Sequence, residues 1–474
     1  MDRQKWWGTE GVNQRDGRSA SGACGRHPGA RLRVPARERA ADAGRAPRCH
    51  ARRRGAREQR CCEDEADNPA PAFGPCGLGC GSGIVSMAQT EDEPAAGEDE
   101  QAEPVELFTT PATKMAAATS DFGYNLFRAL ASQQDGANVF LAPIGVSAVL
   151  TQLALGASER AQRQLFRALR YHTLQDPQLH NTLRDLLTSV KTGNKGLSTA
   201  SRIYLARRLR LKQEFFTAVE QQYGIRPKAL QGGSRDTKDI NDWVASETGN
   251  KVQRLLAKPL PKNPGVNAVA GAYFKGKWVT AFAPQSLQNF QQEGKAPVRV
   301  PMMQQENYPI KMGVDSDLSC TIAQILLQNQ VSMFVFLPQE VTSNLTALEE
   351  TLTAEFVQDL GSTLHATHVT LTMPVLKFSY AADLLTLLPD LGLTDWLADQ
   401  DLEKIAAQPA KLVTVNHKVV MEMAADGDQS APATSATSHL TYHMDRPFLF
   451  LIRDDASGAL LLIGRVINPK DLTI

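Results

Sequence analysis

The chain has 474 residues, with 51 Lys and Arg balanced by 51 Asp and Glu, so its formal net charge is zero. This length allows one large hydrophobic core, or two to three domains of about 150 residues each. Hydrophobic residues make up 42% of the chain, which is typical of a globular protein, and no apolar run approaches the roughly 18 residues that a bilayer-spanning helix needs.

The zero net charge hides a strong asymmetry along the chain. Residues 1–86 are rich in Arg, Gly, Ala and Pro and poor in large aliphatic residues, so we predict that they are disordered or are not authentic coding sequence. A nucleic-acid-binding arm is the alternative, but no aromatic residues are interleaved with the arginine runs. Residues 87–113 read as an acidic linker and 114–474 as the folded domain. No apolar leader core follows Met1, and we interpret 1–86 as standing in place of the genuine leader.

The first third of the folded domain is predicted to be mainly helical, because apolar residues recur at helical spacing from Lys114 onward. The expected elements are a strand at 138–141, a helix from Pro143 to Gly156, two helices within 159–190, a strand at 201–212, a helix at 213–223 and a helix at 240–251.

The rest of the domain is predicted to be mainly strands. The expected elements are strands around a Lys275-Gly276 turn at 268–279, a strand buried on both faces at 331–338, an alternating strand at 368–380, and a C-terminal pair at 447–454 and 459–469 with a turn at Ser457-Gly458. Helices followed by strands indicate a mixed α+β domain with large sheets.

Several segments, taken in order, resemble the serpin family. They are NVFLAP (138–143), INDWVASETGNK (240–251), AYFKGKWVTAF (272–282), VPMM (300–303), LGLTDWL (391–397), VNHKVVMEM (415–423) and DRPFLFLI (445–452). Asn250 stands where the family pattern has Gly. The resemblance runs from Ala116 to Ile474, and it implies an α+β serpin fold: three β-sheets, about nine helices and an exposed reactive-centre-type loop near the C-terminus.

Inhibitory serpins trap a protease when the cleaved loop inserts as a new central strand of a sheet, so the hinge of the loop must fit a buried position. The hinge here lies at about 425–437, where Gly427 matches the family's hinge glycine. Asp428 and Pro432 would share the buried face, because side chains alternate along a strand. A buried unpaired carboxylate costs several kcal/mol, and proline is excluded from central strands. We therefore predict a non-inhibitory protein; the alternative is a serine protease inhibitor that acts by loop insertion.

Basic residues in the segment RRLRLK form a candidate polyanion site. They are Arg207, Arg208, Arg210 and Lys212. Alternation would place the last three on one side of an extended segment, where they could track a sulfated polysaccharide. The resemblance to a secreted, non-inhibitory branch of the family implies heparin or another glycosaminoglycan as ligand. The alternative is an ordinary solvated face.

Acidic residues form the second candidate site. Asp315 and Asp317 would lie on one face of an extended chain, and Asp359 ends the run VQDL. The same resemblance implies that these three residues contact collagen; the alternative is ordinary surface acids. Asn344 begins an N-glycosylation sequon.

No catalytic motif, metal set or cofactor site is recognisable, so we expect no enzyme activity and no cofactor. The resemblance implies an extracellular, secreted glycoprotein of anti-angiogenic or neurotrophic type. It would be a monomer that binds glycosaminoglycan, collagen and an unidentified cell-surface receptor, with no nucleic-acid partner and no membrane insertion.

Overall fold

A computed structural model of the chain describes residues 108–174, 176–260, 265–283, 286–429 and 440–472. These residues all belong to one compact unit, Glu98–Ile474. The predictions made for residues 1–86 and for the linker up to residue 107 lie outside the described part. Within that part, no helix is both long and apolar enough to cross a bilayer.

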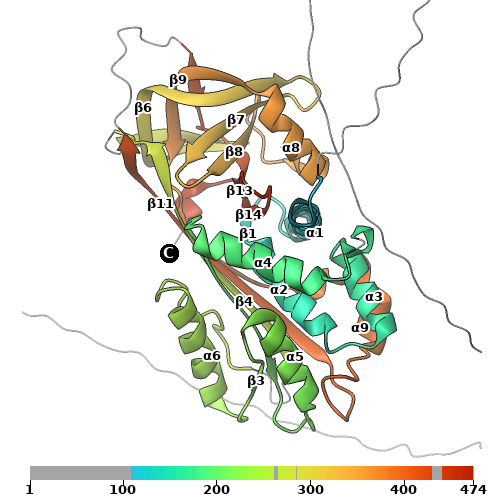
Figure 1. Cartoon of the computed structure of the whole chain (residues 1–474). Helices are drawn as coiled ribbons and strands as arrows, with labels where there is room; N and C mark the ends of the chain where they lie inside the picture. Colours follow the sequence, from blue (N-terminus) through green and yellow to red (C-terminus); the bar gives the residue numbers. More distant parts are fainter. Residues whose placement is uncertain (1–107, 175, 261–264, 284–285, 430–439, 473–474) are drawn as a thin grey trace, which may run out of the picture. The chain divides into compact units, whose positions relative to one another are not determined.

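The described residues contain nine α-helices, the number that the family resemblance implied. They are α1 (Pro111–Ser132), α2 (Pro143–Ala154), α3 (Glu159–Ala168), α4 (Leu179–Thr192), α5 (Gln213–Tyr223), α6 (Ser234–Glu247), α7 (Thr346–Thr351), α8 (Ala354–Thr363) and α9 (Thr394–Asp399). Short helical turns lie at Tyr171–Thr173, Leu384–Leu387, Pro389–Leu393 and Pro469–Asp471. Helix α1 packs against α2 and α4, as Figure 1 shows.

Fourteen strands are described. They are β1 (Val139–Leu141), β2 (Leu197–Leu205), β3 (Lys228–Ala229), β4 (Val266–Thr280), β5 (Ser286–Gln292), β6 (Lys295–Asp315), β7 (Cys320–Leu327), β8 (Val331–Pro338), β9 (His365–Pro374), β10 (Lys377–Asp383), β11 (Leu412–Gln429), β12 (Thr441–His443), β13 (Phe448–Asp454) and β14 (Leu460–Val466).

The strands form one large mixed sheet, in which three groups can be distinguished. One group has the order β3-β2-β4-β11-β10, the second β1-β14-β13-β8-β7, and the third contains β5, β6, β9 and β12. The first two groups are joined where Trp278 of β4 pairs with Leu327 of β7, and the third joins through β6 and β7. All the described strands are therefore linked in one hydrogen-bonded network.

Local sequence explains where several helices begin. Helix α1 starts at Pro111, and the Thr110 hydroxyl accepts a hydrogen bond from the Thr113 N–H at 3.2 Å. The side chains of Ser158 and Thr353 cap α3 and α8 in the same way. Such caps satisfy N–H groups that have no partner within the helix, and proline suits the first turn because it lacks an N–H.

The prediction of a turn at Lys275-Gly276 is wrong, because β4 continues through both residues to Thr280. The glycine is needed there for space. A Cβ at Gly276 would lie 2.7 Å from both Leu327 Cδ2 and Met423 Sδ, which is closer than non-bonded atoms come. A glycine inside a strand thus marks a close approach of neighbouring side chains.

Two other boundaries differ from prediction. The segment 368–380 forms two strands, β9 and β10. Strand β9 ends at Pro374, and β10 then pairs with β11. Helix α6 begins at Ser234, before the expected residue 240. The strands expected at 331–338 and at the C-terminus are confirmed, and every residue of β8, β13 and β14 is buried.

Candidate functional sites

Strand β11 contains two of the three predicted hinge residues. It runs parallel to β4, and the pairing continues to Gly427 opposite Trp278 and to Gln429 opposite Thr280, after a register shift that follows Met423. Asp428 therefore belongs to the backbone of a paired strand. Pro432 lies outside the described residues. A loop strand inserted beside β11 would have to separate it from β4 along this whole edge.

Side chains at the surface also tie β11 to β4. The Glu422 carboxylate accepts a hydrogen bond from the Tyr273 hydroxyl at 2.9 Å, and Lys251 Nζ lies 3.1 Å from the same oxygen. Lys251 follows α6, so the cluster joins three segments that are distant in the sequence. Sequence analysis missed it, because no spacing pattern connects these residues.

Below this cluster, His417 of β11 is buried between main-chain groups. Its Nδ1 lies 2.9 Å from the Ala270 carbonyl oxygen, and its Nε2 accepts a hydrogen bond from the Ala142 N–H at 3.2 Å. This arrangement requires the neutral imidazole with a proton on Nδ1. Burial lowers the pKa of His417 to about 4, because the charged form loses its hydration.

The four candidate basic residues are all exposed, but they do not lie along one extended strand as predicted. Strand β2 ends at Leu205, and the chain turns at Arg207 and Arg208, where the Leu209 N–H bonds to the Ala206 carbonyl at 3.0 Å. We call 207–212 the basic segment. The predicted alternation is wrong for Arg208, because the turn precedes the extended part.

Main-chain hydrogen bonds hold the second half of the basic segment against residues 405–408. The Lys212 N–H bonds to the Ile405 carbonyl, and the Ala407 N–H to the Arg210 carbonyl, both at 2.9 Å. The Arg210 N–H donates to Gln408 Oε1 at 2.6 Å. The backbone is therefore fixed while the Arg210 and Lys212 side chains remain exposed.

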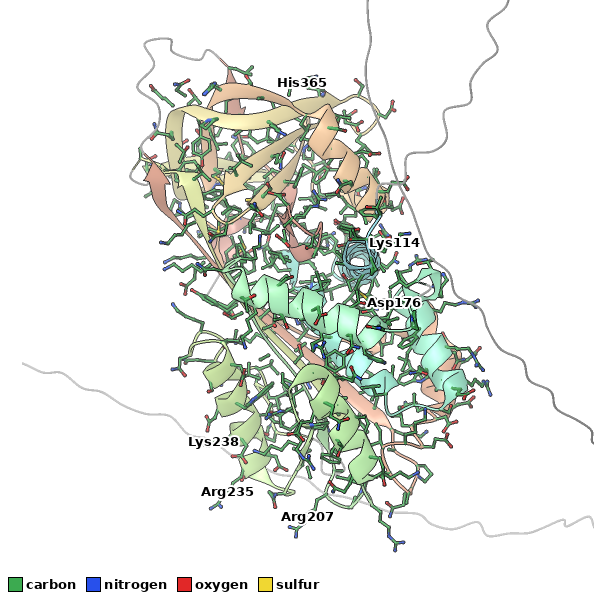
Figure 2. All side chains as sticks on the ribbon, viewed as in Figure 1. Lys114, Asp176, Arg207, Arg235, Lys238 and His365 are labelled. Atoms are coloured by element: carbon green, nitrogen blue, oxygen red, sulfur yellow. The ribbon has the colours of Figure 1, made fainter. Side chains whose placement is uncertain are left out.

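A further exposed arginine, Arg235, lies near the start of α6 and was missed by sequence analysis. Figure 2 shows the side chains of Arg207, Arg235 and Lys238 pointing away from the fold at the same end of the unit. Lys238 is paired with Asp242 of the same helix. Arg207 and Arg235 form no ion pair with another described residue. More than twenty residues separate these arginines, so spacing alone could not have grouped them.

The acidic residues Asp315 and Asp317 differ from each other in the structure, which corrects the prediction of one shared extended face. Asp315 ends β6, and its Oδ1 accepts a hydrogen bond from the Leu318 N–H at 2.9 Å. Asp317 lies in the turn at 316–319 and is exposed. Asp315 is thus part of the turn that joins β6 to β7, whereas Asp317 presents its carboxylate to solvent.

Asp359 is an exposed residue of α8. Helix α8 contacts β6 where Lys311 Nζ lies 3.4 Å from the Gly361 carbonyl oxygen. Asn344 is exposed just before α7, and its Oδ1 accepts a hydrogen bond from the Thr346 N–H at 3.1 Å. Across the part of the chain that the structure describes, no group of His, Cys, Asp and Glu side chains is arranged to hold a metal ion.

Comparisons with known proteins agree with this architecture. Residues 117–469 match the family model described as Serpin (serine protease inhibitor). Pigment epithelium-derived factor from Bos taurus is 40% identical over 372 residues, which cover 77% of this chain and 89% of that protein. Human plasma protease C1 inhibitor is 27% identical over 364 residues, covering 74% and 71%.

Solved structures of the same fold include uncleaved ovalbumin. Its TM-score is 0.67 at 23% identity, covering 75% of this chain and 100% of that one. Maspin superposes with a TM-score of 0.68 at 22% identity, covering 75% and 98%. The strand groups, the helices and the sequence match agree: the chain belongs to the serpin family.

Proposed function

We propose that the protein is a secreted, non-inhibitory serpin that binds extracellular matrix. The basic segment would bind glycosaminoglycan, and the acidic residues Asp315, Asp317 and Asp359 would bind collagen. The similarity to pigment epithelium-derived factor supports a non-inhibitory serpin. An extracellular site of action is supported by relatives such as plasma protease C1 inhibitor, whose name places it in plasma.

The non-inhibitory proposal rests on the continuous pairing between β4 and β11, together with the residues at and after the end of β11. The edge is paired as far as Gln429, and nearly all of β4 is buried. Insertion would have to break this pairing and place Asp428 and Pro432 in the gap. The carboxylate would lose its hydration and the proline would leave a carbonyl without its N–H partner.

A single cut in the loop tests this assignment. A recognition site for a sequence-specific protease is introduced at residues 434–437, and thermal unfolding is measured before and after cleavage. We expect the midpoint to move by only a few degrees, whereas strand insertion would raise it by tens of degrees. The matched variant Asp428→Thr/Pro432→Ala removes both obstacles, and its midpoint should rise after the cut. A large rise in the protein without these two substitutions would indicate a protease inhibitor.

Glycosaminoglycan binding is supported by the exposed side chains and the fixed backbone of the basic segment. A polyanion meets arginines whose main chain is already ordered, so little conformational entropy is lost on binding. Attraction between exposed charges is screened by salt, with a Debye length of about 8 Å at physiological ionic strength. The proposed interaction is therefore salt-sensitive.

Heparin affinity tests this site after residues 1–97 are removed through an engineered cleavage site, because the arginines of that segment would bind heparin themselves. We expect Arg207→Ala/Arg208→Ala/Arg210→Ala to weaken binding by about thirtyfold, on the basis of about 0.7 kcal/mol for each exposed charge. Arg184→Ala is the control, since Arg184 is a partly exposed arginine of α4 that is paired with Asp185 at 3.1 Å. Equal affinity of the triple variant and the control would remove the basic segment from the proposal.

A further inference from the structure

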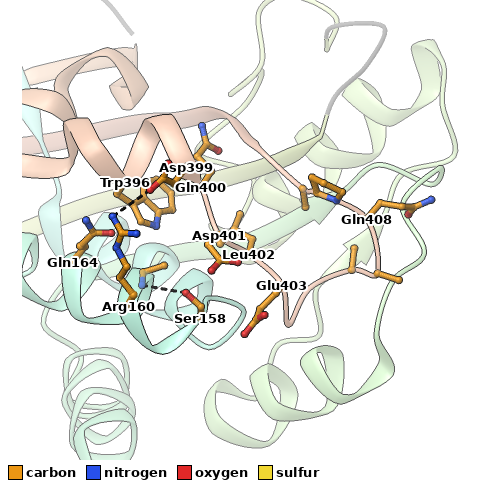
Figure 3. A pocket seen from close by; sticks show the side chains of 15 residues that line it. Ser158, Arg160, Gln164, Trp396, Asp399, Gln400, Asp401, Leu402, Glu403 and Gln408 are labelled. Atoms are coloured by element: carbon orange, nitrogen blue, oxygen red, sulfur yellow. Dashed lines mark hydrogen bonds and ion pairs between the residues drawn. The ribbon is translucent and has the colours of Figure 1, made fainter. Parts of the chain in front are cut away.

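A cavity of about 520 Å³ lies between α3 and the chain that follows α9. Figure 3 shows its wall, formed on one side by Arg160 and Gln164 of α3 and on the other by the turn at Asp401 and Leu402. This volume is within the range of small-molecule sites. Main-chain hydrogen bonds of 3.1 Å join the two sides of the cavity, from the Ser158 N–H to the Asp401 carbonyl and from the Lys404 N–H to the Gly156 carbonyl.

The indole of Trp396 forms the base of the cavity and has an unsatisfied donor. The side chain is 1% exposed, and its Nε1 has no hydrogen-bond partner among the described residues. Figure 3 shows the indole between Arg160 and the Asp401–Leu402 turn. A buried N–H without an acceptor is unfavourable, and nearly all such groups in folded proteins find a partner. The indole N–H thus indicates that an acceptor belongs at this position.

The rim of the cavity is acidic. Asp399, Asp401 and Glu403 follow one another at alternate positions, and Arg160 is the only basic residue of the lining. Arg160 is paired with Asp399 at 3.3 Å. Asp401 and Glu403 are exposed, and neither forms an ion pair with another described residue. The lining therefore carries an excess of negative charge, and it favours a cationic ligand.

Figure 3 shows the paired side chains of Arg160 and Asp399 beside the Trp396 indole. The two side chains are 72% and 61% exposed. Exposed pairs of this kind contribute little to stability, because both charges are well hydrated when separated. A ligand can therefore displace the Arg160 side chain at small cost and reach the Trp396 N–H.

We propose that this cavity binds a small aromatic amine that carries a hydroxyl or carbonyl group. The ammonium group lies between Asp401 and Glu403, the ring packs against Trp396 and the short apolar side chains of the wall, and the oxygen accepts a hydrogen bond from Trp396 Nε1. Aromatic rings attract cations and pack well against other rings, so the base of the cavity suits both parts of the ligand.

The test is a titration of the full chain, labelled with ¹⁵N at tryptophan, with tyramine as the probe. The indole resonance of Trp396 is identified as the one missing from Trp396→Phe. We expect tyramine to shift this resonance saturably and to leave the resonance of Trp243, on α6, unchanged. The neutral probe 4-ethylphenol should bind about fivefold more weakly, since it lacks the ammonium group.

The acidic rim is tested with Asp401→Asn/Glu403→Gln, which keeps the shape of both side chains. We expect tyramine to bind this variant about fivefold more weakly, while an unshifted Trp243 resonance confirms the fold. The proposal is overturned if tyramine leaves the Trp396 resonance unmoved, or if the loss of charge in probe or protein has no effect. It is also overturned if a capped arginine tripeptide binds more tightly than tyramine, because the occupant would then be a basic side chain of a protein.

Discussion

The basic segment 207–212 and the acidic turn at 315–319 are both charged and both solvent-facing, but their charges have different relations to the fold. In the basic segment the main chain makes the stabilising hydrogen bonds and the charged side chains are not needed for them. In the acidic turn the Asp315 carboxylate itself accepts the hydrogen bond that closes the turn. The proposed polyanion site therefore has a backbone fixed by main-chain groups, whereas in the proposed collagen site a charged side chain also closes the turn.

The largest effect is expected from pH, because β11 contains the buried His417, whose ring nitrogens bond to Ala142 and Ala270 rather than to either charged region. Its pKa is about 4 in the folded protein and about 6.5 in the unfolded chain. The unfolded chain binds more protons between these values, so stability is full above pH 6.5 and is lost as the pH falls toward 4. The difference corresponds to roughly 3 kcal/mol.

Urea unfolding at pH 7.0 and pH 4.5 measures this loss. A proton on Nε2 would face the Ala142 N–H, so two donors would oppose each other. His417→Gln should flatten the pH dependence, although His180, whose pKa burial also lowers to about 4, retains part of it. His365→Gln, at an exposed position of β9, is the control and should leave the dependence intact. An unchanged pH profile in His417→Gln would show that the loss has another origin.

The next largest effect is expected in the acidic turn. Asp315→Ala removes the acceptor of the Leu318 N–H, and we expect a loss of about 1 kcal/mol in unfolding free energy, as for other side-chain caps. Asp315→Asn keeps an acceptor oxygen and should recover most of this stability while still lacking the charge. Collagen affinity of the two variants then separates charge from turn geometry.

Asp317→Asn provides the matched control for this pair, since Asp317 is exposed and its stability effect should be near zero. Urea unfolding gives the stabilities, and binding to immobilised collagen gives the affinities. Equal stability of Asp315→Ala and Asp317→Asn would contradict the structural role of Asp315 and make the two charged regions alike.

The smallest effect is expected in the basic segment. Gln408→Ala removes the side-chain acceptor of the Arg210 N–H, and we expect a loss of about 0.5 kcal/mol, because the freed N–H can bond to water. Heparin affinity should fall by less than in the triple arginine variant, since all the charges remain. A loss of heparin binding as large as that of the triple variant would mean that backbone position, rather than charge, dominates recognition.

The sequence predicted the order and type of most elements, because apolar periodicity and end signals are local. It failed where a distant contact decides the conformation. Gly276 looks like a turn residue, but it makes room for Leu327 and Met423. The strand expected at 201–212 ends at Leu205, because the chain then turns and bonds to residues 405–408, which are far away in the sequence.

The candidate sites show the same limit. Charge runs identified the basic segment and the pair Asp315 and Asp317, since neighbours in the sequence carry the signal. The contribution of Asp315 to the turn, the link from Lys251 to Glu422, and the unsatisfied Trp396 indole depend on how distant segments pack. No spacing rule applied to one sequence contains that information.

The hydrogen bonds between residues 405–408 and the basic segment have a thermodynamic consequence. Ala406, Ala407 and Gln408 also line the Trp396 cavity, so one strip of backbone is shared by two proposed ligand sites. If the amine displaces this strip, the affinity for the polyanion must change, and the polyanion must change the affinity for the amine by the same factor. Heparin titrations with and without saturating tyramine, and tyramine titrations with and without saturating heparin, would measure that factor from the two directions, and the two values have to agree.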